Sequence, residues 1–309
     1  MGMIELGEKL KTETSERSAQ KNWVRQAILE KGFQLIEFEG FTIKNDKVSD
    51  KVSALLDRAC FEGTKRQWDT EHILNCVKER FDALFELKMA FAARLEVPWY
   101  FVAYAYNHDR NCVASIYVFQ ILKDAMKLVA RFDQAKDLGA WMQQYRDLEM
   151  RSRYEEKGLP LLDRELRRIG YPWPGNLDAV LACPTGTFLS VVEFQTTIKQ
   201  SVRAHCNNQW FLPRGNRKGD EQRWKVIDII RTQAALPLWI LVWSPNETEI
   251  KLKVVDEIVY SKDVAGRDPG IRYKAKRLMR ERELLNFIQC ACIKSMIKSK
   301  GDCSIHSTF

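Results

Sequence analysis

Two stretches of β type each carry an acidic side chain, and a polar residue follows the second acid two positions later. The first stretch contains Asp178, and the second contains Glu193 and Gln195. Side chains alternate between the faces of a strand, so Glu193 and Gln195 share one face, about 6.6 Å apart at roughly 3.3 Å per residue. If the stretches pair as neighbouring strands, Asp178 comes beside Glu193, and such carboxylates repel each other unless a cation lies between them. Oxygen ligands of this kind favour Mg²⁺, with Mn²⁺ as the alternative.

Helices are predicted before and after these strands. The segment 160–169 has proline at its start and is followed by glycine, as is typical of a short helix. Glu165 lies about 40° from the apolar stripe of this helix at roughly 100° per residue, so it can lean toward the edge of the sheet. A further helix is predicted over about 219–235, and the strand-like run 238–243 follows it.

This order of elements, a helix with Glu165, a strand with Asp178, a strand with Glu193 and Gln195, then a helix and a strand, resembles the PD-(D/E)XK nuclease superfamily. Restriction endonucleases and Holliday-junction resolvases belong to it. The resemblance implies an α/β fold whose restriction-endonuclease-like core has a central mixed β-sheet flanked by helices. It also implies that Asp178, Glu193 and the backbone carbonyl of Phe194 bind Mg²⁺, and that Glu165 is a ligand for a second ion.

Position 195 departs from the family pattern, which has a lysine there that helps to place the attacking water. Gln195 is the residue here, as in some restriction enzymes of the superfamily. A Gln amide can orient a water through hydrogen bonds, but it neither lowers the pKa of that water by charge nor accepts its proton. The metal would therefore have to stabilise the hydroxide. A smaller departure is Leu177, which stands where the motif has proline.

Basic and amide side chains follow the second strand within about one helix and loop. The formal net charge of +8 and the pI near 9.0 favour polyanionic partners. Phosphate contacts use these residue types, so we expect DNA to bind here. The predicted nucleic-acid-binding residues are Lys199, Arg203, His205, Asn207, Asn208, Arg217 and Lys218. His205 could instead be a general base, and RNA is an alternative substrate because the site chemistry is the same.

The chain of 309 residues is long enough for two modest domains, each with its own core. We predict an N-terminal α/β domain, a nuclease domain and a basic helical tail, over residues 1–150, 151–262 and 263–309. In the first domain a long helix is predicted from about Thr70 to Leu95, followed by a hairpin. The helix, proline, hairpin order occurs again after residue 219, so the first domain could be a diverged and non-catalytic copy.

The eight cysteines are scattered, mostly inside apolar stretches, and no secretory signal precedes them. This usage favours reduced buried thiols and a cytoplasmic location. No apolar run approaches the roughly 20 residues of a membrane span. Four zinc-type ligands occur near the C-terminus, but the apolar residues around the first two explain them better as core; the four are Cys290, Cys292, Cys303 and His306.

Together these features predict a cytoplasmic, Mg²⁺-dependent DNA endonuclease that hydrolyses phosphodiester bonds, restriction-like or acting in defence, recombination or a mobile element. Asp178 and Glu193 would bind the metal, and Gln195 would position the water. The alternative is a catalytically inactive DNA-binding or assembly protein with a nuclease-like fold, which the glutamine at position 195 favours. Cleavage of both strands of a duplex would fit a homodimer or a larger complex.

Overall fold

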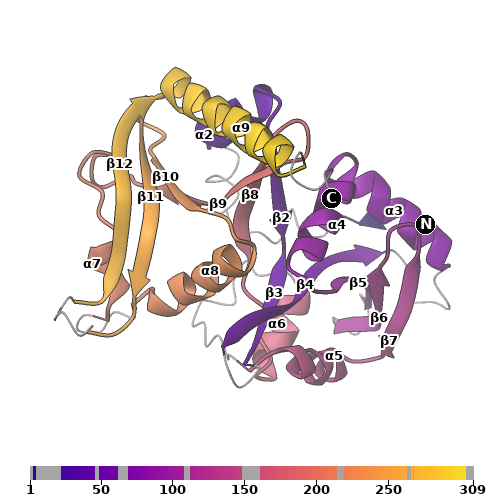
Figure 1. The fold of residues 1–309 in the computed structure, drawn as a ribbon. Coiled ribbons are helices and arrows are strands. Elements are labelled where there is room, and N and C mark those ends of the chain that lie inside the picture. The colour runs from indigo at the N-terminus through magenta and orange to yellow at the C-terminus, as the bar shows by residue number, and fades with distance from the viewer. Residues whose placement is uncertain are drawn as a thin grey trace. The chain divides into compact units, whose positions relative to one another are not determined.

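The chain folds into two compact units, which the computed structural model in Figure 1 colours by residue number. Unit 1 comprises residues 1–17 and 38–177, and unit 2 comprises residues 18–37 and 178–309. In the described residues each unit contains a mixed sheet of six strands with helices packed on it, so the predicted α/β class is confirmed. The structure describes residues 3–4, 22–45, 49–61, 69–107, 112–147, 161–213, 219–262, 266 and 268–303.

Unit 1 is built on a sheet with the strand order β1-β4-β5-β6-β7, and β3 also pairs with β4. The strands are β1 (Met3–Ile4), β3 (Gly40–Asn45), β4 (Asp50–Phe61), β5 (Trp99–Asn107), β6 (Cys112–Ile121) and β7 (Met126–Phe132). The helices are α3 (Thr70–Phe81), α4 (Leu84–Arg94), α5 (Ala135–Met142), the 3₁₀ helix η1 (Gln143–Tyr145) and α6 (Leu161–Arg168). The predicted hairpin after Pro98 is formed by β5 and β6, which pair antiparallel.

The long helix predicted from Thr70 to Leu95 is wrong in one respect, because the segment forms the two helices α3 and α4. They are separated at Asp82, whose φ of 43° lies in the left-handed region. A residue in that region cannot continue a right-handed helix. The apolar spacing runs through this break, which explains why the pattern alone does not reveal it.

Unit 2 is built on a sheet with the strand order β12-β11-β10-β9-β8-β2. Its strands are β2 (Gln34–Phe38), β8 (Leu177–Ala182), β9 (Phe188–Thr196), β10 (Leu238–Trp243), β11 (Glu249–Val259) and β12 (Gly270–Arg280). Its helices are α2 (Trp23–Glu30), α7 (Asn208–Phe211), α8 (Glu221–Gln233) and α9 (Glu281–Cys303). Strands β9 and β10 are parallel and are connected through α8, whereas β8 and β9 are antiparallel.

The two faces of the unit 2 sheet differ in character. Val192 of β9 points to an apolar core, where Ile28 of α2 and Ile288 of α9 are buried with it. Phe194 packs against the same core. Because side chains alternate along a strand, Glu193 points to the opposite face, at the place where α8 begins. Figure 1 shows α9 and α8 on different sides of this sheet.

These units differ from the predicted domains of 1–150, 151–262 and 263–309. Strand β2 is a neighbour of β8 in the sheet of unit 2, so unit 1 is inserted between two adjacent strands of unit 2. Val24 and Ile28 of α2 share a core with Leu181, more than 150 positions later in the chain. Contacts of such long range leave no local signal in the sequence.

The predicted basic helical tail is helical only from Glu281 onward. Residues 270–280 instead form β12, which pairs antiparallel with β11. The charged side chains of this segment hid its strand character, because an edge strand with exposed cations lacks the apolar alternation of a buried one. Among the helices that the structure describes, none combines the length and the apolar character that crossing a bilayer requires.

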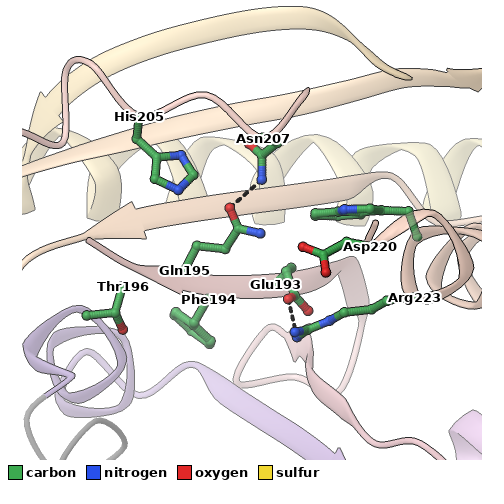
Figure 2. A pocket seen from close by; sticks show the side chains of 9 residues that line it. Glu193, Phe194, Gln195, Thr196, His205, Asn207, Asp220 and Arg223 are labelled. Atoms are coloured by element: carbon green, nitrogen blue, oxygen red, sulfur yellow. Dashed lines mark hydrogen bonds and ion pairs between the residues drawn. The ribbon is translucent and has the colours of Figure 1, made fainter. Parts of the chain in front are cut away.

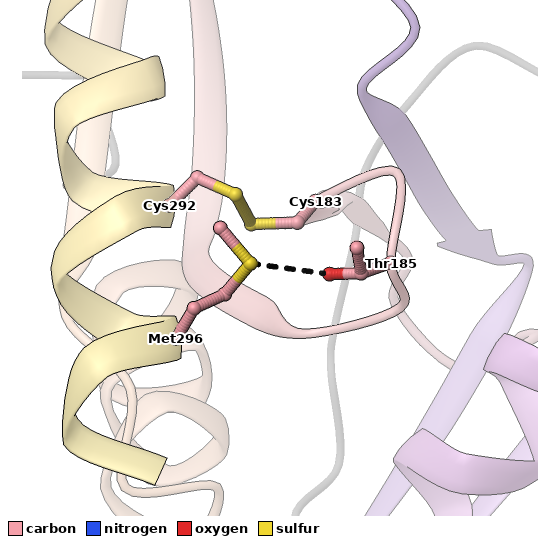
Figure 3. The surroundings of a disulfide bond; sticks show 4 residues. All are labelled: Cys183, Thr185, Cys292 and Met296. Atoms are coloured by element: carbon pink, nitrogen blue, oxygen red, sulfur yellow. Dashed lines mark hydrogen bonds between the residues drawn. A yellow bond between two sulfur atoms is a disulfide. The ribbon is translucent and has the colours of Figure 1, made fainter. Parts of the chain in front are cut away.

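A disulfide joins Cys183, directly after β8, to Cys292 of α9, which corrects the expectation of reduced thiols for this pair. The two Cα atoms are 5.9 Å apart, and the cysteines are separated by 109 positions in the sequence. Figure 3 shows the bond beside Met296, whose sulfur accepts a hydrogen bond from the hydroxyl of Thr185 at 4.0 Å. Cys292 is therefore not free to join the four-residue zinc set considered above.

Candidate functional site

A pocket of about 330 Å³ opens on the face of the unit 2 sheet to which Glu193 points. Strand β9 contributes Glu193 and Gln195, and the start of α8 contributes Arg223. The loop between β9 and α7 contributes His205 and Asn207. Figure 2 shows these side chains converging from the three segments. The remaining lining residues are Phe194, Thr196, Asp220 and Trp224.

The pairing predicted for the two acid-bearing strands is confirmed. Ala179 of β8 lies opposite Val192 of β9 in the antiparallel ladder, so one step further Asp178 faces Glu193. The backbone N–H of Phe194 donates to the Asp178 carboxylate at 2.8 Å, which holds that side chain at the ladder. Two carboxylates from adjacent strands therefore share one side of the sheet.

Glu193 is the most confined of these acids, with only 1% of its surface exposed. Burial raises its pKa well above the ordinary value, and the negative charge of Asp178 raises it further. Apart from the ion pair that Arg223 forms with one of them, the carboxylate oxygens of Glu193 have no hydrogen-bond partner in the described residues. A buried carboxylate beside a second carboxylate is a place where a cation is favoured.

Without a bound metal ion, Arg223 supplies positive charge next to the carboxylates of Glu193 and Asp178. Its guanidinium forms an ion pair with Glu193, drawn as a dashed line in Figure 2, and lies 3.7 Å from the nearer oxygen of Asp178. The guanidinium side chain is half exposed, in contrast to the buried Glu193. Asp220 lines the same pocket, and burial raises the pKa of its carboxyl while Arg223 lowers it. Among the described residues, the carboxylates of Asp178, Glu193 and Asp220 thus lie near the Arg223 guanidinium.

Gln195 belongs to a second set of contacts on the same face. Its carboxamide oxygen accepts a hydrogen bond from the amide nitrogen of Asn207. The carbonyl oxygen of Asn207 in turn accepts from the ammonium of Lys253 and, at 3.0 Å, from the hydroxyl of Tyr273. Lys253 lies on β11, and Tyr273 lies on β12, so the set extends across the sheet.

His205 completes this set. Its Nδ1 lies 3.0 Å from the Lys253 ammonium nitrogen, and its backbone carbonyl accepts from Lys251 at the same distance. Burial, together with the charges of Lys253 and Lys251, lowers the pKa of His205 to about 4. The imidazole is therefore neutral at pH 7. Burial lowers the pKa of Lys253 to about 7, and the neighbouring Lys251 contributes to the shift.

The structure brings together Asp178, Glu193 and Gln195, with Phe194 between them, but not Glu165. Glu165 lies on α6 in unit 1, where its carboxylate accepts a hydrogen bond from the backbone of Val113 at 2.6 Å. The helix predicted over 160–169 therefore packs with the other unit, and its acid is engaged there. No group of three or more His, Cys, Asp and Glu side chains in the described residues is arranged to bind a metal ion.

The predicted nucleic-acid-binding residues fall into different environments. His205 and Asn207 line the pocket, whereas Lys199 and Arg203 are exposed on the loop after β9. The side chain of Asn208 bonds both backbone groups of Ile271, so it fixes β12 to the start of α7. Arg217 and Lys218 lie outside the described residues.

Two further residues of the site were not singled out from the sequence: Asp220, which lines the pocket, and Lys253, which lies behind it. Asp220 is three positions before Arg223 at the start of a predicted helix, a spacing that places side chains on one helix face and that could have indicated it. Lys253 had no such signal, because it lies 46 positions from Asn207 on a strand of ordinary alternating pattern.

Comparisons with known proteins add little to this geometry. No protein-family model and no curated protein sequence matches the chain. A solved structure described as the sex pheromone staph-cAM373 precursor aligns with 8% identity over 88% of this chain and 98% of that chain, at a TM-score of 0.21. The C-terminal domain of that precursor from Staphylococcus aureus aligns with 7% identity over 73% and 65%, at a TM-score of 0.12. Scores this low carry no argument, so the PD-(D/E)XK resemblance stays a prediction from the sequence.

Proposed function

We propose that the protein is a Mg²⁺-dependent endonuclease that hydrolyses phosphodiester bonds in DNA, with its active site in unit 2. The observation that carries the proposal is the placement of Asp178 opposite Glu193 on adjacent strands, with Gln195 two positions on and facing the same pocket. Two carboxylates on adjacent strands are part of the superfamily motif, and Gln195 stands where that motif has a lysine.

The order of elements in unit 2 supports this proposal. Strands β8 and β9 form the acid-bearing hairpin, and α8 then leads to β10, which lies parallel to β9. This is the succession on which the resemblance depends. The helix that precedes the strands and packs on this sheet is α2, in place of the predicted helix over 160–169.

The donor set fits Mg²⁺. Glu193 has two buried carboxylate oxygens, one of them ion-paired with Arg223, and Asp178 adds a second carboxylate from the neighbouring strand. Mg²⁺ usually keeps several waters and takes only one or two carboxylates from the protein, so a cluster of three acids is not required. When bound, the ion supplies Lewis acidity toward a phosphoryl oxygen and lowers the pKa of a coordinated water. Mn²⁺ fits the same oxygens.

Hydrolysis joins a water oxygen to phosphorus and breaks one phosphorus–oxygen ester bond, and the departing oxygen ends with a proton. In this reaction Asp178 and Glu193 bind the cation, while Gln195 orients the water by hydrogen bonding. The exposed Lys199 and Arg203 lie on the loop that forms one wall of the pocket, where cations can contact DNA phosphates.

A second candidate is a catalytically inactive DNA-binding or assembly protein. The Arg223 guanidinium is paired with Glu193 and lies near Asp178, so the protein already provides the charge that a metal would bring. Gln195 also lacks the positive charge of the family's lysine. In this candidate the carboxylates would hold Arg223 permanently and would have no role in turnover.

Cleavage of supercoiled plasmid, single-stranded DNA and RNA with Mg²⁺, Mn²⁺ or EDTA separates the two candidates. The nuclease should cut DNA only with a divalent cation, and Asp178→Asn should reduce the rate by on the order of 1,000-fold without weakening DNA binding in a gel-shift assay. Asp256→Asn, the same change at an exposed acid of β11 outside the pocket lining, serves as the matched control. DNA binding without any cleavage by the wild type would favour the inactive candidate.

A further inference from the structure

Lys253 is a buried cation that has no part in the proposed reaction as described above. Only 1% of its surface is exposed, and its ammonium contacts Asn207, His205 and, at 5.6 Å, the ring of Tyr273. None of these partners is a carboxylate, and the described residues give Lys253 no ion pair. A buried ammonium without a counter-ion costs several kcal/mol. An apolar side chain at this position of β11 would avoid that cost. A lysine here therefore indicates that the ammonium has a specific role.

The ammonium determines which way the carboxamide of Asn207 faces. The carbonyl oxygen of Asn207 accepts from both Lys253 and Tyr273, and Asn207 is only 4% exposed. A flipped carboxamide would bring its NH₂ group against the ammonium, donor against donor. With the oxygen held by Lys253, the nitrogen of Asn207 must face Gln195, where it donates to the carboxamide oxygen.

The hydrogen bond from Asn207 also determines the orientation of the Gln195 carboxamide. Because its oxygen is engaged by Asn207, its NH₂ group faces the other way. In Figure 2 this nitrogen points toward the side of the pocket where Glu193 and Asp220 lie. Gln195 therefore presents a hydrogen-bond donor next to the carboxylates, as a lysine at this position would. A donor at this place can hold the oxygen of a water or of a phosphate.

We propose that Lys253 is a positioning residue: through Asn207 it holds the Gln195 carboxamide with its nitrogen toward the carboxylate pair. Resting on the proposed function, this assigns to a buried lysine of β11 the orientation of the neutral donor that replaces the motif's lysine. The pKa of Lys253, lowered to about 7, agrees with an ammonium that is desolvated at the back of the pocket. Lys253 itself does not line the pocket.

The kinetic test uses Lys253→Met, which keeps the length of the side chain and removes its donors. We expect kcat for DNA cleavage to fall on the order of 100-fold, while KM changes by less than about threefold. Asn207→Leu, which leaves Lys253 in place and breaks the connection, should give the same kcat. Lys262→Met makes the same substitution at an exposed position of the same unit and should retain the wild-type kcat.

Rescue distinguishes positioning from a general loss of structure. If Lys253 acts through Gln195, then Gln195→Lys in the Lys253→Met background supplies a charged donor directly and should raise kcat about tenfold or more. A variant that is merely damaged in its fold would gain nothing from this second change. Wild-type kcat in folded Lys253→Met or Asn207→Leu, or absence of rescue, would overturn the proposal.

A measurement without turnover separates this proposal from the proposed function. The carboxamide NH₂ signals of Gln195 can be assigned in ¹H–¹⁵N NMR spectra by their loss in Gln195→Glu. They should shift in Lys253→Met and in Asn207→Leu and stay unchanged in Lys262→Met. If the wild type cuts no DNA with any cation, the proposed function is wrong. The NMR signals of Gln195 then still test whether Lys253 orients the carboxamide. Unchanged Gln195 signals in both variants would refute this role of Lys253.

Discussion

Glu193 occupies a position that is unfavourable for a carboxylate in the protein alone. It is buried, it faces Asp178, and its half-exposed partner Arg223 compensates only part of the cost. Groups whose pKa is shifted by burial and by a like charge are common in active sites, where a ligand repays the cost. Binding of the cation that we propose would therefore relieve the unfavourable burial and charge repulsion of the Glu193 carboxylate.

The first prediction follows from this unfavourable burial. Because the native pKa of Glu193 is raised, the native state binds a proton that the unfolded state releases, so the stability contribution of this group falls as pH rises through that window. Glu193→Gln should therefore stabilise the metal-free protein at pH 8 by roughly 1–2 kcal/mol in urea unfolding, and it should abolish cleavage. Glu257→Gln, an exposed acid of β11, is the control. A lower stability of Glu193→Gln would contradict the account.

His205 gives a second prediction, in acid. Its native pKa of about 4 lies below the ordinary value of 6.5, so its contribution to stability is complete above pH 6.5 and is lost as pH falls toward 4. Between pH 6.5 and 4 the wild type should lose on the order of 2–3 kcal/mol more than His205→Asn, which keeps an acceptor for Lys253. Urea unfolding at both pH values measures this, with the exposed His72→Asn as control. Equal losses in wild type and His205→Asn would refute the burial of a neutral imidazole.

At the scale of elements, strand alternation predicted the shared face of Glu193 and Gln195, and the expected pairing of the two acid-bearing strands occurs between β8 and β9, which are close in sequence. Helix spacing and the family resemblance assigned Glu165 to the site, and no pattern identified Lys253. Which helix packs on a sheet depends on partners far along the chain, and α2 and α6 look equally suitable in isolation. Local periodicity carries no information about that choice.

The disulfide between the end of β8 and α9 links two elements that bound the core of unit 2. Cross-links of this kind stabilise mainly by restricting the unfolded chain, and the effect grows with the length of the loop. Reduction should therefore lower the free energy of unfolding by about 2–4 kcal/mol. Cys292→Ser should reproduce the loss without reductant, whereas Cys290→Ser, at an exposed free thiol of the same helix, should not. Identical urea midpoints with and without reductant would contradict the structural role of the bond.

At the scale of the whole molecule, the sequence of unit 1 is inserted between β2 and β8, which are neighbours in the sheet of unit 2, and the two ends of the insertion lie close together. The backbone N–H of Phe41 donates to the carbonyl of Gly175 at 3.1 Å, and the indole of Trp173 donates to the carbonyl of Glu39 at 2.9 Å. Insertions with adjacent ends are tolerated because the host strands need not move. No composition shift in the sequence reveals this arrangement, since both units have ordinary globular composition.

The final prediction is that unit 2 folds without the insertion. Replacing residues 41–175 by about four glycine and serine residues should leave a protein that unfolds cooperatively, because its core is made only from residues before 38 and after 177. Circular dichroism and thermal unfolding measure this. The intact chain and the same deletion with Leu181→Asp, a change in the buried core, serve as references. Failure of the shortened chain to fold would show that unit 1 contributes to the stability of unit 2.

The central claim, that a divalent cation binds between Asp178 and Glu193, is tested most directly by anomalous diffraction from crystals grown with Mn²⁺. The account predicts an anomalous peak within about 2.3 Å of an oxygen of each carboxylate, with the Arg223 guanidinium displaced from Glu193. No peak at this place, with Arg223 still paired to Glu193 at saturating Mn²⁺, would contradict the nuclease proposal and favour the inactive candidate.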